Sequence, residues 1–144
     1  MSQDSLVAHA STVIEAGRAD VWRALTDPAA LRQWMMGADV ASDWRAGSPI
    51  TWKGEFQGKR FEDRGSVLEA VPEKLLRYTH FSPMSGKPDE PANYHTVTIT
   101  LAGTDWTEVT LAQDNNTTED ARRESERNWM AMLGGLKRYV EGAK

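Results

Sequence analysis

The chain has 144 residues, of which 40% are hydrophobic and 26% are charged, and its formal net charge is −4. This size and balance are those of one globular domain with a substantial core, so we expect residues 1–144 to form a single domain and exclude a disordered chain. The acidic balance and the lack of a Lys/Arg-rich run argue against nucleic acid as a partner.

The N-terminal part of the chain is predicted to contain one strand and two short helices. Residues 7–15 are rich in β-branched and small side chains, which favour a strand. Asp20 is expected to cap the first helix and Asp27 the second. Pro28 then takes the first helical position, where the N–H that it lacks would have had no partner.

From residue 37 to residue 113, apolar and polar side chains alternate with a period of two, which is typical of strands with one buried face. Tight turns are predicted at 57–58 and 103–105, so neighbouring strands are expected to run antiparallel. The alternation predicts strands at 50–56, 61–71, 76–81, 95–101 and 107–113.

The longest interruption of this pattern is the segment 82–92. It contains three prolines and one glycine, which argue against regular structure. A loop of this length inside a small domain either serves a function or is a plain excursion over the surface. The sequence leaves both interpretations open.

A long C-terminal helix is predicted from about residue 118 to residue 141. Its apolar stripe comprises Trp129, Leu133, Leu136 and Val140. Gly134 and Gly135 each cost about 1 kcal/mol relative to alanine inside a helix, so either close packing or a local bend is needed to explain the pair. Together the elements predict an α+β fold in which six or seven antiparallel strands curl around this helix.

Several residue types and segments are absent from the sequence. Cysteine does not occur, which excludes disulfides, thiolate zinc sites and a cysteine nucleophile, and which suits a reducing compartment. The first residues show neither the basic nor the apolar region of a signal peptide, and no stretch approaches the roughly 20 apolar residues that span a bilayer. We therefore expect a cytoplasmic protein that is not bound to membranes.

Five segments spread over nearly the whole chain form a recognisable pattern. They are Val21-Trp22-Arg23-Ala24-Leu25-Thr26-Asp27-Pro28 with Leu31 and Trp34, Gly65-Ser66-Val67-Leu68-Glu69, Pro72-Glu73-Lys74-Leu75, Thr107-Glu108-Val109-Thr110-Leu111, and Trp129 with Leu133, Leu136 and Tyr139. With these segments the chain resembles the START-like (SRPBCC) superfamily, and within it the branch named after the activator of heat-shock-protein ATPase. The resemblance implies a helix-grip fold like that of the birch-pollen allergen, with two short helices after the first strand.

The helix-grip fold implied by this resemblance leaves a cavity between the concave face of the sheet and the long helix. Side-chain alternation along the strands and the helix then predicts which residues line it. The expected ligand-binding residues are Trp44, Trp52, Phe56, Tyr78, His80, His95, Val97, Gln113, Trp129 and Leu133. An apolar pocket with a few polar groups suits a small hydrophobic or aromatic molecule. The alternative is that these side chains simply fill the core.

Among these residues, His80 and His95 most strongly suggest a chemical role. They flank the proline-rich loop on consecutive strands and are expected to lie nearly opposite each other. Metal binding, acid–base catalysis and simple polarity at a cavity rim, with bonds to Tyr78, Asn93 or water, are the three interpretations. No carboxylate is expected on the same face and no HExxH-type spacing occurs, so we predict no metal. No cofactor is expected.

Three classes of function remain open. The leading one is non-enzymatic binding of a small hydrophobic or aromatic molecule, such as a lipid, in stress response or signalling. The second is a protein interaction module with a chaperone partner, by analogy with the name-giving branch. The third is an enzyme of the cyclase or hydrolase type that uses His80 or His95 in the same cavity.

Trp106 is expected on the outer face, where it either marks a homodimer contact or is an ordinary exposed side chain of a monomer.

Overall fold

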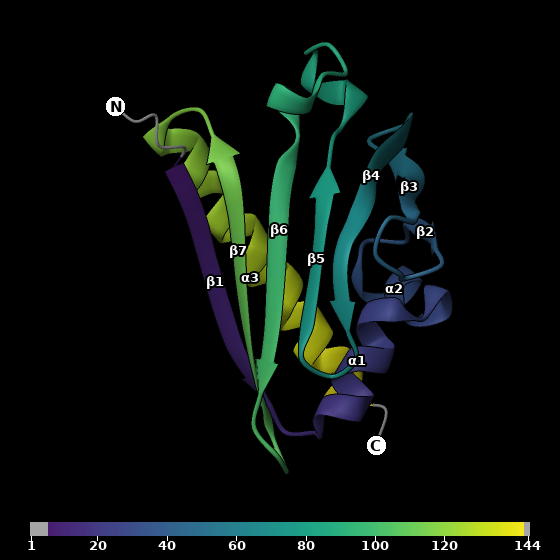
Figure 1. Ribbon diagram of the computed structural model, residues 1–144, viewed down its shortest axis with the longest axis vertical. Coiled ribbons are helices and arrows are strands. Elements are labelled where there is room, and N and C mark those ends of the chain that lie inside the picture. The colour runs from purple at the N-terminus through teal and green to yellow at the C-terminus, as the bar shows by residue number, and fades with distance from the viewer. Residues whose placement is uncertain (1–5, 143–144) are drawn as a thin grey trace.

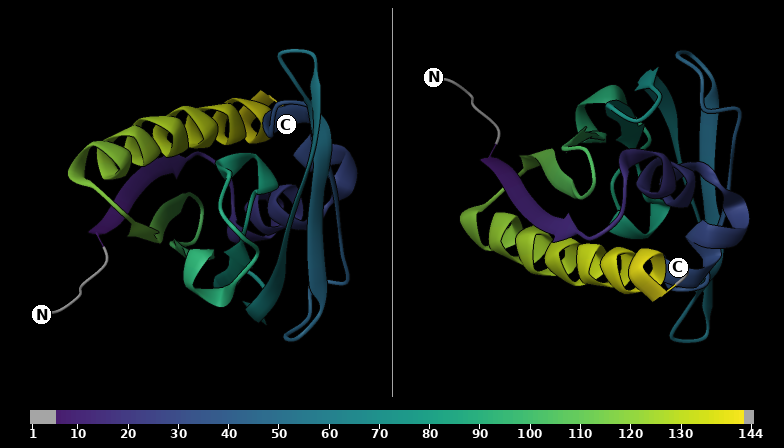
Figure 2. Two further views of the ribbon diagram at one scale, coloured as in Figure 1. Left: turned by 90° about the horizontal axis from the view of Figure 1, so that it is seen from above. Right: turned by 90° about the horizontal axis from the view of Figure 1, so that it is seen from below.

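The computed structural model describes residues 6–142, except the side chain of Phe56. Seven antiparallel strands form one curved sheet in the order β1-β7-β6-β5-β4-β3-β2, and the long helix α3 crosses its concave face (Figures 1 and 2). The elements are β1 (Leu6–Ile14), α1 (Arg18–Thr26), α2 (Pro28–Trp34), β2 (Asp39–Ser42), β3 (Pro49–Phe56), β4 (Lys59–Val71), β5 (Leu75–His80), η1 (Pro83–Ser85), η2 (Pro91–Asn93), β6 (His95–Ala102), β7 (Thr107–Asn116) and α3 (Glu119–Gly142). The predicted α+β helix-grip fold is confirmed.

The two short helices follow β1 as predicted, but the first begins earlier than expected. Its N-cap is Gly17, and Asp20 lies inside the first turn, so the prediction that Asp20 is the cap is wrong. An acidic side chain there still lies near the positive end of the helix dipole. The second helix has the predicted Asp27 cap with Pro28 at its first position, although the Asp27 side chain makes no capping hydrogen bond.

The β3–β4 hairpin forms the part of the sheet that curls over toward the C-terminal end of α3 (Figure 2). Its two-residue turn has positive φ at both positions, 52° at Gln57 and 79° at Gly58, which matches the twist of the flanking strands. Farther along β4, a Cβ on Gly65 would lie 1.7 Å from the carbonyl oxygen of Thr79. Glycine is therefore required where β4 passes close to β5, just before the register shift between Val67 and Glu69.

The predicted apolar stripe of α3 is buried against the sheet at three of its four positions, Leu133, Leu136 and Val140, while Trp129 is half-buried. A Cβ on Gly135 would lie 3.5 Å from the carbonyl oxygen of Trp34 at the end of α2, and one on Gly134 would meet only a guanidinium nitrogen at 3.4 Å. These are ordinary van der Waals distances. Steric crowding therefore does not require glycine at either position.

The β5–β6 connection is more regular than predicted, because two short 3₁₀ helices, η1 and η2, each begin with a proline. Proline suits the first position of a helix since its φ is already helical. The connection is also tied to the sheet: the Phe81 and Tyr94 rings stack with centroids 5.1 Å apart, and Arg64 pairs with Asp89 at 3.1 Å.

Helix α3 also contacts the free edge of β1 through charged side chains. Glu126 Oε2 accepts a hydrogen bond from the backbone N–H of His9 at 3.0 Å, and Glu141 Oε2 accepts one from the N–H of Glu15 at 2.9 Å. Lys137 Nζ donates to the Val13 carbonyl at 2.7 Å.

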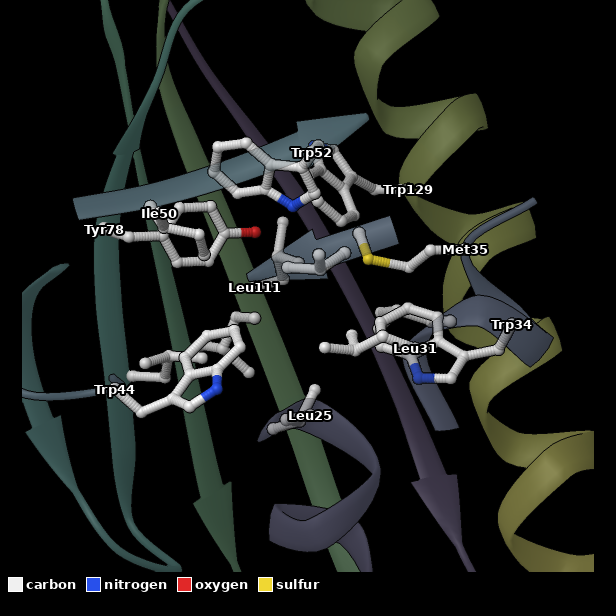
Figure 3. Close-up of a pocket in the computed structure, with 14 residues that line it drawn as sticks. Leu25, Leu31, Trp34, Met35, Trp44, Ile50, Trp52, Tyr78, Leu111 and Trp129 are labelled. Atoms are coloured by element: carbon white, nitrogen blue, oxygen red, sulfur yellow. The ribbon is translucent and has the colours of Figure 1, made fainter. Parts of the chain in front are cut away.

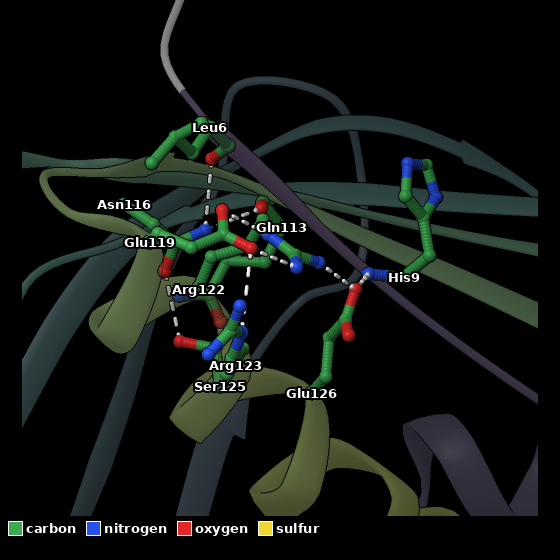
Figure 4. A network of polar contacts seen from close by, with 9 residues as sticks. All are labelled: Leu6, His9, Gln113, Asn116, Glu119, Arg122, Arg123, Ser125 and Glu126. Carbon is green, nitrogen blue, oxygen red and sulfur yellow. Dashed lines mark hydrogen bonds and ion pairs between the residues drawn. The ribbon is translucent and has the colours of Figure 1, made fainter.

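Near the start of α3, Arg122 bridges two carboxylates of the same helix. Its guanidinium group bonds Glu119 and also Glu126, at 2.6 Å (Figure 4). Arg123 Nε also lies 3.4 Å from Glu119 Oε2. Glu126 is thereby held between a guanidinium group and the β1 backbone, so its charge is stabilised from two sides.

Candidate ligand-binding site

A cavity of about 410 Å³ lies between the concave face of strands β3 to β7, the residues after α2, and α3. Seven of the residues predicted from the sequence line it: Trp52, Tyr78, His80, His95, Val97, Gln113 and Trp129. They come from four strands (β3, β5, β6 and β7) and one helix, and alternation along each strand turns their side chains to the same side of the sheet.

Trp44 and Leu133 are placed elsewhere. They line an adjoining inner space of only about 20 Å³, which Leu25, Trp34 and other core side chains surround (Figure 3). Trp44 has a φ of 56° in the connection between β2 and β3, and its ring packs against the core. These two residues therefore contribute to packing rather than to the walls of the larger cavity. The predicted role of Phe56 concerns a side chain outside the described part of the structure.

The walls of the cavity contain a connected group of rings. The Trp52 centroid is 5.4 Å from that of Tyr78 and 4.9 Å from that of His80, which it meets edge-on. His80 and His95 are directly paired across β5 and β6, as predicted, and their ring centroids are 6.4 Å apart. Distances of this size are those at which aromatic rings attract each other.

Asp63 is the principal residue that sequence reasoning missed. Its Oδ2 lies 2.9 Å from Nε2 of His80, so the expectation that no carboxylate shares the histidine face is wrong. The two-residue turn of the β3–β4 hairpin sets the register and places Asp63 directly opposite Trp52. Directly paired residues share a face of the sheet, so extending this register from the turn would have identified Asp63.

The hydrogen bonds of the two histidines determine which ring nitrogens carry protons. An ionised carboxylate and a carbonyl only accept, so His80 donates from Nε2 to Asp63, and His95 donates from Nδ1 to the Asp114 carbonyl at 2.9 Å. In the neutral rings, Nδ1 of His80 and Nε2 of His95 are then acceptors. These partners replace the predicted rim contacts to Tyr78 and Asn93.

The second oxygen of Asp63 has no partner. Oδ1 is buried and accepts no hydrogen bond from the described residues, while the Asp63 side chain as a whole is 15% exposed. A buried polar atom without a partner is destabilising by about 1–3 kcal/mol, and such atoms are uncommon in folded proteins. The unpaired Oδ1 therefore offsets part of the stability that the hydrogen bond to His80 contributes.

Tyr78 and Gln113 complete the polar groups of the deeper wall. Burial raises the pKa of Tyr78 above its ordinary value of 10.0, so its hydroxyl stays protonated at neutral pH. Gln113 Oε1 accepts a hydrogen bond from the Trp129 indole N–H, which ties α3 to β7 at the cavity. The orientation of the Trp129 ring is thus set by a bond as well as by packing.

Methionines surround the opening. Four of the six methionines of the chain line the cavity, namely Met35, Met36, Met84 and Met132. Met36 is 76% exposed and Met84 is 51% exposed, so this rim is in contact with solvent. Unbranched methionine side chains adapt to ligands of different shape. Met35, Met36 and Met84 were not identified from the sequence, because they lie outside the predicted strands and the predicted long helix.

The carboxylates among the cavity-lining side chains give the lining a negative charge. Glu55 and Asp63 carry carboxylates, and among residues 6–142 neither a lysine nor an arginine lines the cavity. Among the residues described by the structure, no cluster of three histidine, aspartate or glutamate side chains is arranged to hold a metal ion. Within 6–142, no helix is both long enough and apolar enough to cross a membrane.

Comparison with known proteins agrees with this architecture. The solution structure of ChR145 from Cytophaga hutchinsonii is 48% identical, with a TM-score of 0.86 over 99% of this chain and 98% of that one. CV1439 from Chromobacterium violaceum is 25% identical, with a TM-score of 0.76 over 97% and 99% of the two chains. The Aha1 dimer from Colwellia psychrerythraea is 21% identical, with a TM-score of 0.72 over 94% and 96%.

No curated protein sequence matches the chain. Residues 15–141 match the family described as Activator of Hsp90 ATPase homolog 1-like protein. This match spans more than half of the sequence and includes all of the cavity-lining residues. The chain therefore belongs to the Activator of Hsp90 ATPase homolog 1-like family, within the SRPBCC helix-grip superfamily.

Proposed function

We propose that the protein binds a small hydrophobic or aromatic molecule in the 410 Å³ cavity. The cavity itself is the observation that carries this proposal. Ligand pockets in proteins usually measure about 300–1,000 Å³, so the space suits a small ligand rather than a large lipid. Its walls are mostly apolar and aromatic, and they carry a few polar groups, among them the hydrogen-bonded pair Asp63 and His80.

Native mass spectrometry of protein purified from its source tests this proposal, with a co-purifying small molecule as the expected result.

The neutral fluorescent probe N-phenylnaphthylamine gives a second test, because its emission rises in an apolar cavity. Met132→Trp is expected to abolish the signal by filling the opening, since Met132 lines the cavity from α3. Met130→Trp is the matched control, because Met130 lies on the same helix, is exposed and does not line the cavity. Probe emission that neither rises nor responds to Met132→Trp would refute binding in this cavity.

Proton transfer in the same cavity is a second candidate function. It is favoured by the Asp63–His80 pair, in which a carboxylate orients an imidazole, as in many general bases. The test is to incubate the co-purified molecule with the protein and follow its mass. A ligand that keeps its mass supports binding alone, whereas conversion that His80→Gln abolishes supports catalysis.

The family description also motivates proposals about partners. A heat-shock chaperone is a candidate partner by family analogy, and stimulation of a purified chaperone ATPase would test it.

The Colwellia relative forms a dimer, and Trp106 is 50% exposed between β6 and β7, so a homodimer of this chain is proposed as well. The absence of cysteine from the sequence supports our proposal that the protein resides in the cytoplasm.

A further inference from the structure

We infer that the ligand of this cavity is a small organic cation, an amine with an aromatic or aliphatic body, and not an acid. This inference rests on the proposed binding function and specifies its ligand class. Three features of the walls carry it: the sign of their charge, the kind of hydrogen-bonding atoms that they offer, and their aromatic faces.

The charge of the lining is negative. Glu55 and Asp63 are the charged residues of its described lining, and no lysine or arginine of the described chain compensates them there. The nearby Arg64 is paired with Asp89 on the β5–β6 connection, and Arg138 lines a neighbouring groove along α3, which shares Met36, Trp129 and Met132 with the cavity but whose arginine is not part of the cavity lining. A cavity with low-dielectric walls strengthens such a field, so a carboxylate ligand is repelled and a cation is attracted.

The hydrogen-bonding atoms that Asp63 and the two histidines offer to a ligand are acceptors. His80 and His95 each use one ring N–H on the protein itself, which leaves one lone pair on each neutral ring. The carboxylate of Asp63 receives a single N–H, from His80, and its other oxygen has no partner among the residues that the structure describes. An ammonium group brings three donors and no acceptor, and it therefore complements this wall.

The aromatic residues suit the same ligand. Trp52, Tyr78 and Trp129 line both the cavity and the small inner space that Figure 3 shows, and Phe61 lies on the same strand face as Asp63. The faces of aromatic rings attract cations, tryptophan most strongly. Apolar parts of the ligand pack against the same rings and against the methionines of the rim.

The test compares three probes that share a naphthyl ring and differ in charge: naphthylethylamine, naphthylethanol and naphthylacetate. Binding is followed by the NMR shifts of the Trp52 and Trp129 indole N–H groups at neutral pH and low ionic strength. The amine is expected to bind about ten-fold more tightly than the alcohol, and the acetate more weakly than either.

Asp63→Asn is expected to remove most of the preference for the amine while the alcohol still binds. Glu62→Gln is the matched control, because it removes the same charge from the adjacent residue of β4, which is exposed and does not line the cavity. The control should keep the full preference.

Equal binding of the three probes, or tightest binding of the acetate, would overturn the inference and leave the binding function standing. A preference for the amine that Asp63→Asn does not reduce would also overturn it. Failure of all three probes together with N-phenylnaphthylamine would overturn the binding function itself.

Discussion

Replacing Asp63 with alanine should leave the stability of the unliganded protein nearly unchanged. The substitution removes a buried oxygen without a partner, which is worth about 1–3 kcal/mol in favour of the variant. It also removes the 2.9 Å hydrogen bond from His80 to an ionised acceptor, which is worth about 1.5–3 kcal/mol in favour of the original protein. His80 is 30% exposed, so water can take the place of the lost partner.

These two contributions nearly cancel, and we expect the free energy of unfolding to change by no more than about 1 kcal/mol. Urea denaturation at neutral pH, followed by far-ultraviolet circular dichroism, measures the change. Leu76→Ala in the neighbouring strand shows the sensitivity of the assay, because this buried side chain should cost about 2–5 kcal/mol. A loss of about 3 kcal/mol or more in Asp63→Ala would show that the carboxylate stabilises the fold, as in a buried ion pair, and would refute the reasoning.

Four further predictions concern other parts of the molecule. His95→Leu removes a polar group and keeps much of the volume, so it should weaken a ligand with a polar group by about 1–3 kcal/mol in calorimetric titration, with little change in melting temperature. Gly65→Ala should destabilise the protein by about 3 kcal/mol or prevent folding, because its Cβ would lie 1.7 Å from a carbonyl oxygen of β5; a melting temperature equal to that of the original protein would contradict this. Gly134→Ala should raise the stability by about 1 kcal/mol in urea denaturation, since the new methyl group meets only the end of a flexible side chain at 3.4 Å. The backbone N–H of His9 and the Arg122 guanidinium group lower the pKa of Glu126 below its ordinary 4.5. The stabilisation that Glu126 provides is therefore present above pH 4.5 and is lost as the pH falls below that value. Glu126→Gln should make the stability of the protein less dependent on pH in this acidic range, as measured by urea denaturation.

The fold could be predicted from the sequence because local signals and the overall pattern agree. Alternation along the strands, the Asp27-Pro28 start of α2 and the stripe of α3 all indicate the same architecture. The start of α1 was predicted wrongly because no side chain marks it. Gly17 begins α1 as an N-cap without a side-chain bond, and this start leaves little trace in the sequence.

The candidate site was predictable to the extent that it lies on regular strands. Alternation identified Trp52, Tyr78 and His95, whose positions follow from a period of two. It did not identify Asp63, because that requires the register of two strands as well as the period of one. Trp44 lies in the connection between β2 and β3 with a positive φ, so alternation along a strand does not predict where its ring lies.

The contacts between α3 and β1 have a consequence for how copies of the protein meet. An exposed strand edge is a template on which another chain can add a strand. Here Glu126, Lys137 and Glu141 already occupy backbone groups of that edge, so an incoming strand would have to displace three charged side chains. At the opposite edge β2 has only four residues, too few for extended pairing. Both borders of the sheet therefore resist growth into fibrils, and self-association of this protein should proceed through its faces.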